Sequence, residues 1–115
     1  MPETSVPELV DIADFEKLQL KIAKILAAES LEKSNKLIKL TVSTGDKTKT
    51  ILSGIRKYYK PEELIGKKVV IIDNLKPAKM LGIDSQGMVL AAMENGEKLS
   101  LLVLDKDLAE CSSIS

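Results

Sequence analysis

One stretch of the sequence combines residue types that suit contact with a polyanion. It runs over residues 74–88 and reads NLKPAKMLGIDSQGM. Lys76 and Lys79 flank a proline, which fixes one backbone angle, and two glycines permit close approach of the backbone to a ligand. This chemistry suits contact with phosphate and ribose, not bond breaking. Ser85 is a candidate donor to a phosphate or 2′-hydroxyl and Met88 a candidate contact to a base, although a loop serine and a core methionine are the alternative interpretations.

The side chains that most catalytic and metal centres use are scarce. The sequence has no histidine and a single cysteine, Cys111, which leaves no Ser-His or Cys-His nucleophile, no internal disulfide and no cysteine cluster for a metal. The acidic pairs at 62–63 and 105/107 fit surface solvation better than acid–base work. No glycine-rich phosphate loop of the Walker or Rossmann kind occurs. We therefore expect no catalytic residue, no metal and no cofactor.

The charges cancel overall but are distributed unevenly. The chain has 17 basic and 17 acidic residues. Residues 17–79 hold 15 basic and 6 acidic residues, a balance of +9, and the rest of the chain holds 2 and 11, a balance of −9. This basic block favours an anionic partner, although lysines that merely solvate the outer face of a sheet explain it equally well.

Aromatic side chains are too few for a base-stacking surface. Phe15, Tyr58 and Tyr59 are the only ones in the sequence. Barrels that hold single strands without sequence preference stack successive bases on aromatic side chains. If the partner is a nucleic acid, it must therefore be recognised through its backbone and shape, as folded RNA is.

The length and the hydrophobic periodicity predict one small β domain. We expect residues 1–8 to form a flexible arm and residues 9–115 to form the domain with a C-terminal extension. No apolar run approaches the roughly 18 residues that span a bilayer, and we expect a soluble, cytoplasmic protein without membrane contact. The expected strands are 18–28, 37–42, 48–52, 69–72 and 88–93, with a further apolar segment at 99–104 and short helices at 9–18 and 61–66.

Three strands, a short helix and two more strands match the order of an all-β, five-stranded Greek-key barrel of the oligonucleotide/oligosaccharide-binding (OB) type. Such barrels bind through strands two and three and through the loops that join strands 1–2 and 4–5. Those loops are expected at residues 29–35 and 74–87, so the cationic stretch falls on the binding rim. A small barrel of another connectivity remains open on this evidence.

Other candidate contacts lie close to these loops. Asn35 and Lys36 close the 1–2 loop. The barrel's polar face offers Lys21 and Lys39, and the helical insert begins near Arg56 and Lys57. The alternative interpretation of each is an ordinary solvated side chain.

Several segments together resemble the tRNA-binding domain family. They are DFEK at 14–17, SNKLIKL at 34–40, SGI at 53–55, YKPEELIGK at 59–67, and NLKP and SQGM within 74–88. The match covers nearly all of residues 14–110. That family includes the C-terminal domain or separate beta subunit of methionyl-tRNA synthetase and a free-standing structure-specific tRNA-binding protein.

The resemblance implies an OB barrel that grips the outside corner of folded tRNA and, in bacterial members, a homodimer. It points to six residues of this chain: Asn35, Lys36, Lys76, Lys79, Ser85 and Met88. The implied role is non-catalytic, as the beta subunit or a trans-acting accessory of a methionyl-tRNA synthetase catalytic subunit. The C-terminal extension is the expected dimer contact, and Cys111 stands there where a glycine is expected.

A dimeric chaperone or export factor is the alternative, because a branch of the same family resembles that activity. The NLKP and SQGM elements favour the tRNA-binding branch. An enzyme in its own right is disfavoured by the missing histidine and nucleotide loop.

Overall fold

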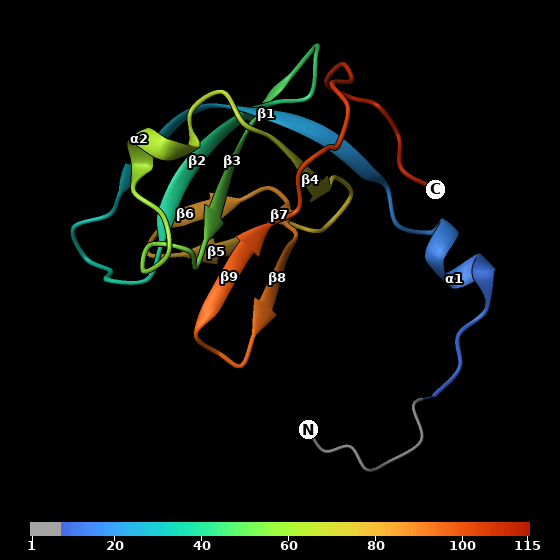
Figure 1. Cartoon of the computed structure of the whole chain (residues 1–115), viewed down its shortest axis with the longest axis horizontal. Coiled ribbons are helices and arrows are strands. Elements are labelled where there is room, and N and C mark those ends of the chain that lie inside the picture. The colour runs from blue at the N-terminus through green and yellow to red at the C-terminus, as the bar shows by residue number, and fades with distance from the viewer. Residues whose placement is uncertain (1–7) are drawn as a thin grey trace.

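The computed structural model describes residues 8–115, so the predicted arm lies outside the described residues except for Glu8. Five strands form one curved antiparallel sheet in the order β3-β2-β1-β4-β7 (Figure 1). They are β1 (Leu20–Ser30), β2 (Ile38–Ser43), β3 (Thr48–Ser53), β4 (Lys68–Ile72) and β7 (Met88–Val89), with α2 (Pro61–Leu64) between β3 and β4. The predicted all-β OB-type barrel, with its helix between the third and fourth strands, is confirmed.

Strand β1 is long enough to serve two neighbours. Its first half pairs with β4, from Leu20 opposite Ile72 to Lys24 opposite Lys68. Its second half pairs with β2, and the register shifts between Ile25 and Ala27. A shift of this kind bends a strand and increases its twist. The sheet can therefore curl around its own inner face.

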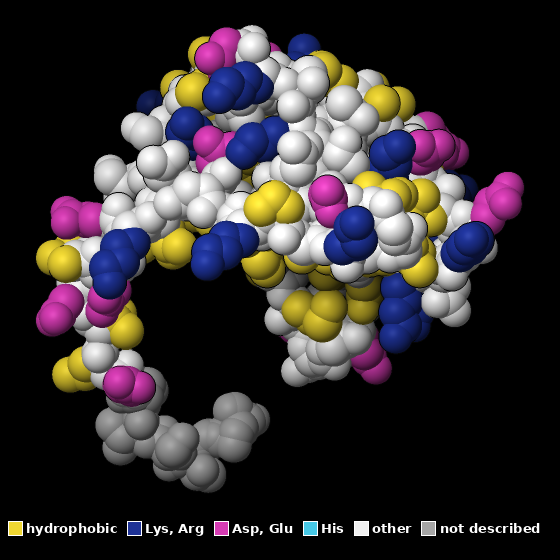
Figure 2. Space-filling model, turned by 180° about the vertical axis from the view of Figure 1, so that it is seen from behind, with side chains coloured by type: hydrophobic (Ala, Val, Ile, Leu, Met, Phe, Trp, Pro, Cys, Tyr) yellow, Lys and Arg dark blue, Asp and Glu magenta, His cyan; other side chains and the backbone are white. Residues whose placement is uncertain are grey.

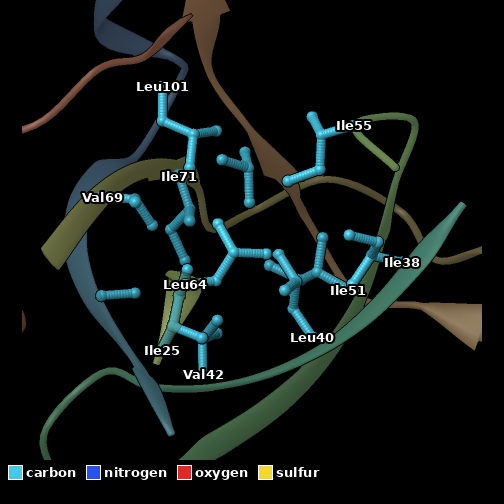
Figure 3. Close-up of a cluster of buried hydrophobic side chains, with 12 residues drawn as sticks. Ile25, Ile38, Leu40, Val42, Ile51, Ile55, Leu64, Val69, Ile71 and Leu101 are labelled. Carbon is cyan, nitrogen blue, oxygen red and sulfur yellow. The ribbon is translucent and has the colours of Figure 1, made fainter. Parts of the chain in front are cut away.

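Alternate residues of the strands fill that inner face. β2 buries every second side chain and β4 does the same, as the period of a half-buried strand requires. Leu64 of α2 is fully buried and covers one end of the barrel. The converging side chains are seen in Figure 3, and the core consists of Ala23, Ile25, Ile38, Leu40, Val42, Ile51, Ile55, Leu64, Val69, Ile71, Val89 and Leu101.

The seam between β3 and the segment that follows β6 is closed by side chains as well as backbone. The Ser85 hydroxyl accepts a hydrogen bond from Leu52 N at 3.0 Å. Gln86 N donates to Thr50 O at 2.8 Å, and Thr50 N donates to Gln86 Oε1 at 2.8 Å. The SQGM element of the sequence thus completes the barrel.

The 4–5 segment is more ordered than the predicted loop. It folds into a hairpin of β5 (Ala78–Met80) and β6 (Ile83–Ser85), turned by Leu81 and Gly82. Both turn residues have positive φ, 52° and 78°, which is the pattern of a type I′ turn. The period-two pattern is too short here to be recognised in the sequence.

The predicted fifth strand at 88–93 is divided. Leu90 N donates to Val70 O at 2.9 Å, and Leu102 N donates to Leu90 O at 3.2 Å. The chain therefore changes partner at Leu90 and leaves the sheet in a second hairpin of β8 (Ala91–Glu94) and β9 (Lys98–Leu101). The apolar segment predicted at 99–104 contributes only its first residues to a strand.

Helix α1 (Ile12–Glu16) is shorter than the predicted helix at 9–18, and none of its residues is buried. Only Phe15 is partly buried and Ile12 is 72% exposed, so the helix packs weakly, and one turn of helix gains little stability from propensity alone. No helix within residues 8–115 has the length and hydropathy needed to cross a membrane.

The C-terminal extension returns along β1. Cys111 N donates to Ile22 O at 2.7 Å and Ile114 N donates to Leu20 O at 3.1 Å. Cys111 has a φ of 73°, in the left-handed region that favours glycine. This backbone conformation explains why a glycine is expected at that position.

Candidate functional site

The two lysines of the 4–5 segment lie on a firmly attached hairpin. Lys76 precedes β5 and Lys79 lies within it, and both are exposed. Neither has a carboxylate within 4.0 Å in the part of the chain that the structure describes. Ser85 and Gln86 bind the base of the hairpin to β3. The hairpin and the residues just before it therefore present two ammonium groups, without an ion pair among the described residues, from a firmly attached backbone.

The connection between β1 and β2, residues 31–37, is held from beneath by Arg56. Its guanidinium donates to the carbonyl oxygens of Leu31, at 3.0 Å, and Ser34. The Ser34 hydroxyl accepts hydrogen bonds from the backbone N–H groups of Lys36 and Leu37 at 3.1 and 3.0 Å. These bonds leave Asn35 and the Lys36 side chain exposed at the tip. The Arg56 side chain therefore stabilises the connection by binding two of its backbone carbonyl groups.

The two loops meet across a shallow groove of about 420 Å³. One side is residues 29–33 of the 1–2 region with Lys39, and the other is Leu81 and Ile83 of the β5–β6 hairpin. We call the 1–2 connection and this hairpin together the rim. Asn35, Lys36, Lys76 and Lys79 lie outside the lining of this groove, within or next to the two segments that border it.

The remaining basic candidates differ in their surroundings. Lys39 lies 3.6 Å from the Glu29 carboxylate, a mostly exposed ion pair. Lys57 is exposed in the turn after β3, and no ion pair joins it to another residue of the 8–115 region. Lys21 is paired with Asp73, whose side chain is 13% exposed. Lys21 therefore differs from the solvated lysines of the rim.

Asp73 joins two lysines at the end of β4. The Lys21 ammonium lies 3.1 Å from Oδ2 and the Lys49 ammonium 2.6 Å from Oδ1, the latter an ion pair at an angle outside hydrogen-bond geometry. Lys49 also donates to the Asp73 carbonyl oxygen at 2.8 Å. Burial by itself raises the pKa of Asp73, but the two ammonium groups outweigh it and lower that pKa below its ordinary value. Contact with Asp73 raises the pKa of Lys21.

Ser85 and Met88 have opposite environments. Ser85 is 3% exposed, and its hydroxyl accepts from Leu52 N and donates to Gly87 O at 3.3 Å. Met88 is 51% exposed on β7. Both line a cavity of about 340 Å³ between β3 and the β5–β6 hairpin. Ser85 is a buried part of its lining, and Met88 is far more exposed than Ser85.

Basic side chains are not confined to one patch of the surface. Figure 2 shows Lys and Arg side chains spread over the body of the molecule, with Asp and Glu side chains interspersed among them and along the α1 segment at its edge. The basic side chains of residues 17–79 are therefore distributed over several parts of the surface. Other lysines, Lys57 among them, also have no ion pair among residues 8–115, so the rim is distinguished by where its lysines lie and not by their lack of partners.

Three contributors were absent from the sequence prediction. Gln86 closes the barrel seam, Asn74 accepts from Gln19 N at 2.8 Å and donates to Lys17 O at 2.7 Å, and Lys49 pairs with Asp73. The NLKP and SQGM elements contain the first two, so their positions could be found as part of a motif. Lys49 alternates with threonines on β3 and gives no signal of its long-range partner.

The barrel and its rim together define an OB-type domain with a cationic loop surface suited to an anionic ligand. The family described as "Putative tRNA binding domain" matches residues 20–113. The chain belongs to this family, as its sequence motifs predict.

Known relatives agree with this assignment. The chain is 51% identical over 111 residues to a methionine–tRNA ligase of Deinococcus radiodurans, matching 93% of this chain and 16% of that protein. A methionine–tRNA ligase of Methanocaldococcus jannaschii is 49% identical over 107 residues, with the same coverage of both chains. The chain thus spans about a sixth of the length of the curated relatives it matches.

Solved structures share the fold over nearly the whole chain. A MetRS-related protein from Pyrococcus horikoshii has a TM-score of 0.89 and 37% identity, covering 95% of this chain and all of that one. The chaperone CsaA from Bacillus anthracis has a TM-score of 0.86 and 28% identity, covering 94% of this chain and all of that one.

Proposed function

We propose that this chain is a non-catalytic tRNA-binding module that holds the outside corner of folded tRNA on its rim. The observation that carries the proposal is that Lys76, just before the β5–β6 hairpin, and Lys79, within it, have no ion pair among residues 8–115, while Asn35 and Lys36 of the 1–2 connection are exposed. Ammonium groups free of carboxylates can neutralise phosphates, which supplies most of the sequence-independent affinity for nucleic acid. Family membership supports tRNA as the ligand.

The environment of Tyr59 supports recognition of RNA by its shape and backbone instead of by base stacking. The Tyr59 hydroxyl accepts a hydrogen bond from Leu101 N at 3.2 Å, and its ring packs against the core. Tyr59 is thus engaged within the domain and offers no open face for a run of stacked bases. Phosphates and 2′-hydroxyls of a folded RNA remain the contacts that the rim can make.

The proposed context is the beta subunit or a trans-acting accessory of a methionyl-tRNA synthetase in the cytoplasm. The similarity to a short segment of methionine–tRNA ligases supports it, because a detached binding domain can raise the effective concentration of tRNA at a catalytic partner. A homodimer belongs to the same proposal. The exposed apolar side chains of Leu102, Val103 and Leu108, in and before the C-terminal extension, would become buried in it.

A titration tests the proposed ligand. The full chain is titrated with folded tRNA, heat-unfolded tRNA and duplex DNA at several salt concentrations. We expect tightest binding to folded tRNA, and Lys76→Ala and Lys79→Ala should each weaken it several-fold and reduce the slope of log K against log salt by about 0.7–0.9. Lys98→Ala on β9 is the matched control and should bind as the native chain does. Equal affinity for all three ligands, or unchanged binding by both rim variants, would contradict the proposal.

A chaperone is the second candidate because the likeness to CsaA covers the whole of that chain. Met93 and Val103, which are more than half exposed, provide apolar surface for an unfolded polypeptide. Suppression of aggregation of a reduced, unfolded protein distinguishes the two functions. Suppression that excess folded tRNA does not relieve, together with weak tRNA binding, would favour the chaperone.

A further inference from the structure

The cavity between β3 and the β5–β6 hairpin has the size and lining of a site for one flat apolar group. Its volume is about 340 Å³, within the range of small-ligand pockets, which begins at roughly 300 Å³. Leu75, Met80 and Met88 supply apolar walls, and two of these side chains are substantially exposed: Leu75 at 39% and Met88 at 51%. A thioether makes favourable contacts with an aromatic ring.

The charge at this cavity favours one class of occupant. Among the described residues, no aspartate or glutamate lines it, and its one charged lining residue is Lys76. An apolar slot beside a single ammonium group that has no ion pair among residues 8–115 matches a nucleotide, whose base is flat and whose phosphate is anionic. An apolar side chain of a polypeptide would fill the walls but would leave Lys76 without a partner.

We propose that this cavity receives one unstacked nucleobase of the bound RNA, with Met80 and Met88 against the ring and Lys76 placed to meet its phosphate. The inference rests on the proposed function, since it names a contact within the same RNA complex. It also assigns distinct roles to these residues. Lys79 and Lys36 contact only the RNA backbone, and the cavity between β3 and the β5–β6 hairpin contacts a base.

The floor of the cavity is preformed. Ser85 is buried and bonded to the backbone of Leu52 and Gly87. Gly87 packs so closely that a Cβ there would lie 2.9 Å from Ile72 O. The floor therefore need not be ordered when a ligand binds, which preserves affinity.

Methyl resonances of methionine test the inference on the native chain. The protein is labelled with ¹³C at methionine methyl groups and titrated with folded tRNA. An aromatic ring in the cavity should shift the Met80 and Met88 methyl signals upfield by its ring current, while Met93 on β8 should stay unshifted. Tripolyphosphate carries charge without a ring and should leave all three signals nearly unmoved.

A substitution that fills the cavity provides the second test. Ala78 lines the cavity and is exposed, so Ala78→Leu adds volume there without entering the core. We expect about tenfold weaker binding of folded tRNA with an unchanged salt slope, because a base contact is lost and no phosphate contact is. Ala91→Leu makes the same change at an exposed position of β8 and should bind normally.

The outcomes separate this inference from the proposed function. If the native chain binds folded tRNA but the Met80 and Met88 methyl signals do not shift, the base site is wrong and the tRNA-binding function stands. If the native chain does not bind folded tRNA, the function itself fails. Loss of polypeptide binding or of self-association in Ala78→Leu, with tRNA binding intact, would assign the cavity to a protein partner and overturn the inference.

Discussion

Hairpins β5–β6 and β8–β9 both turn through left-handed residues, and they differ in loop length and in how they join the barrel. Each turns through two residues of positive φ, Leu81–Gly82 in one and Asn95–Gly96 in the other. The first is bound to β3 through Ser85 and Gln86, whereas all four residues of β8 are exposed. The comparison shows that strand pairing within a hairpin is not enough to hold it in place. Hydrogen bonds between the hairpin and the barrel are what fix its position.

Charge separates the same two hairpins. Lys76 and Lys79, which have no ion pair among residues 8–115, accompany β5–β6, where Asp84 lies opposite Lys79, while β8–β9 carries Glu94 and Glu97 with Lys98 at its turn. Cations on an attached backbone lose less conformational entropy when a ligand binds than cations on a mobile segment do. The attached hairpin is therefore the one suited to an anionic partner.

The largest contrast is expected at the glycines of the two hairpins. At Gly87, where β6 leads into the sheet, a Cβ would lie 2.9 Å from Ile72 O and 3.3 Å from Ile51 Cδ1, whereas at Gly96 it meets nothing within 4 Å. Gly87→Ala should lower the free energy of unfolding by about 3 kcal/mol. Gly96→Ala should cost about 1 kcal/mol through its left-handed φ alone. Urea unfolding of both variants measures this, and similar losses would refute the difference in packing.

A second contrast concerns the aspartates next to the two hairpins. Asp73, before β5, is 13% exposed between two lysines, whereas Asp107, after β9, is 89% exposed beside Lys68. Asp73→Asn should lower the free energy of unfolding at neutral pH by about 2 kcal/mol, because Lys21 and Lys49 lose their shared counter-charge. Asp107→Asn is the control and should have the smaller effect.

The pH dependence follows from the lowered pKa of Asp73. Its ordinary value is 3.8 and its value in the fold is lower. The stability it contributes is therefore fully present above pH 3.8 and is lost as the pH falls through the folded-state pKa. Urea unfolding between neutral pH and pH 3 should show a weaker acid dependence for Asp73→Asn than for the native chain. Parallel curves would show that the ion pairs with Asp73 contribute nothing.

Serines in the two hairpins provide a smaller contrast. Ser85 is buried and accepts a hydrogen bond from Leu52 N, while Ser100 on β9 is exposed. Ser85→Ala should lower the free energy of unfolding by about 1.5 kcal/mol because the Leu52 N–H loses its partner inside the barrel. Ser100→Ala should change it by less than about 0.5 kcal/mol. Thermal and urea unfolding compare them, and equal effects would show that the seam does not depend on this hydroxyl.

The smallest expected effect lies at the turns. Leu81 has a φ of 52° and is exposed, whereas the equivalent residue of the other turn is Asn95 at 54°. Asparagine tolerates this conformation better than leucine. Leu81→Asn should therefore stabilise the chain by about 0.5–1 kcal/mol, and Asn95→Leu should destabilise it by a similar amount. A destabilised Leu81→Asn variant would show that the groove contact of Leu81 outweighs its backbone strain.

The sequence by itself determined the strands of the barrel and the family. Alternating apolar residues in β2 and β4 predict half-buried strands because side chains alternate across a sheet whatever its partners. The NLKP and SQGM elements could also be recognised from the sequence, because each consists of contiguous residues. Their place in the strand order indicated the loop that forms part of the rim. Lysine and arginine residues that could contact phosphates could be identified from the sequence by residue type.

Only the tertiary structure decided which candidates are free. Lys21 and Lys76 are both lysines beside apolar residues in the sequence, but Asp73, distant from Lys21 along the chain, pairs with Lys21 and Lys49, whereas Lys76 has no ion pair among residues 8–115. The partner change at Leu90 likewise depends on Val70 and Leu102, which local periodicity cannot reveal. Ion pairs and strand pairings join segments that are distant in the sequence. Which residues pair is therefore decided only when the barrel closes.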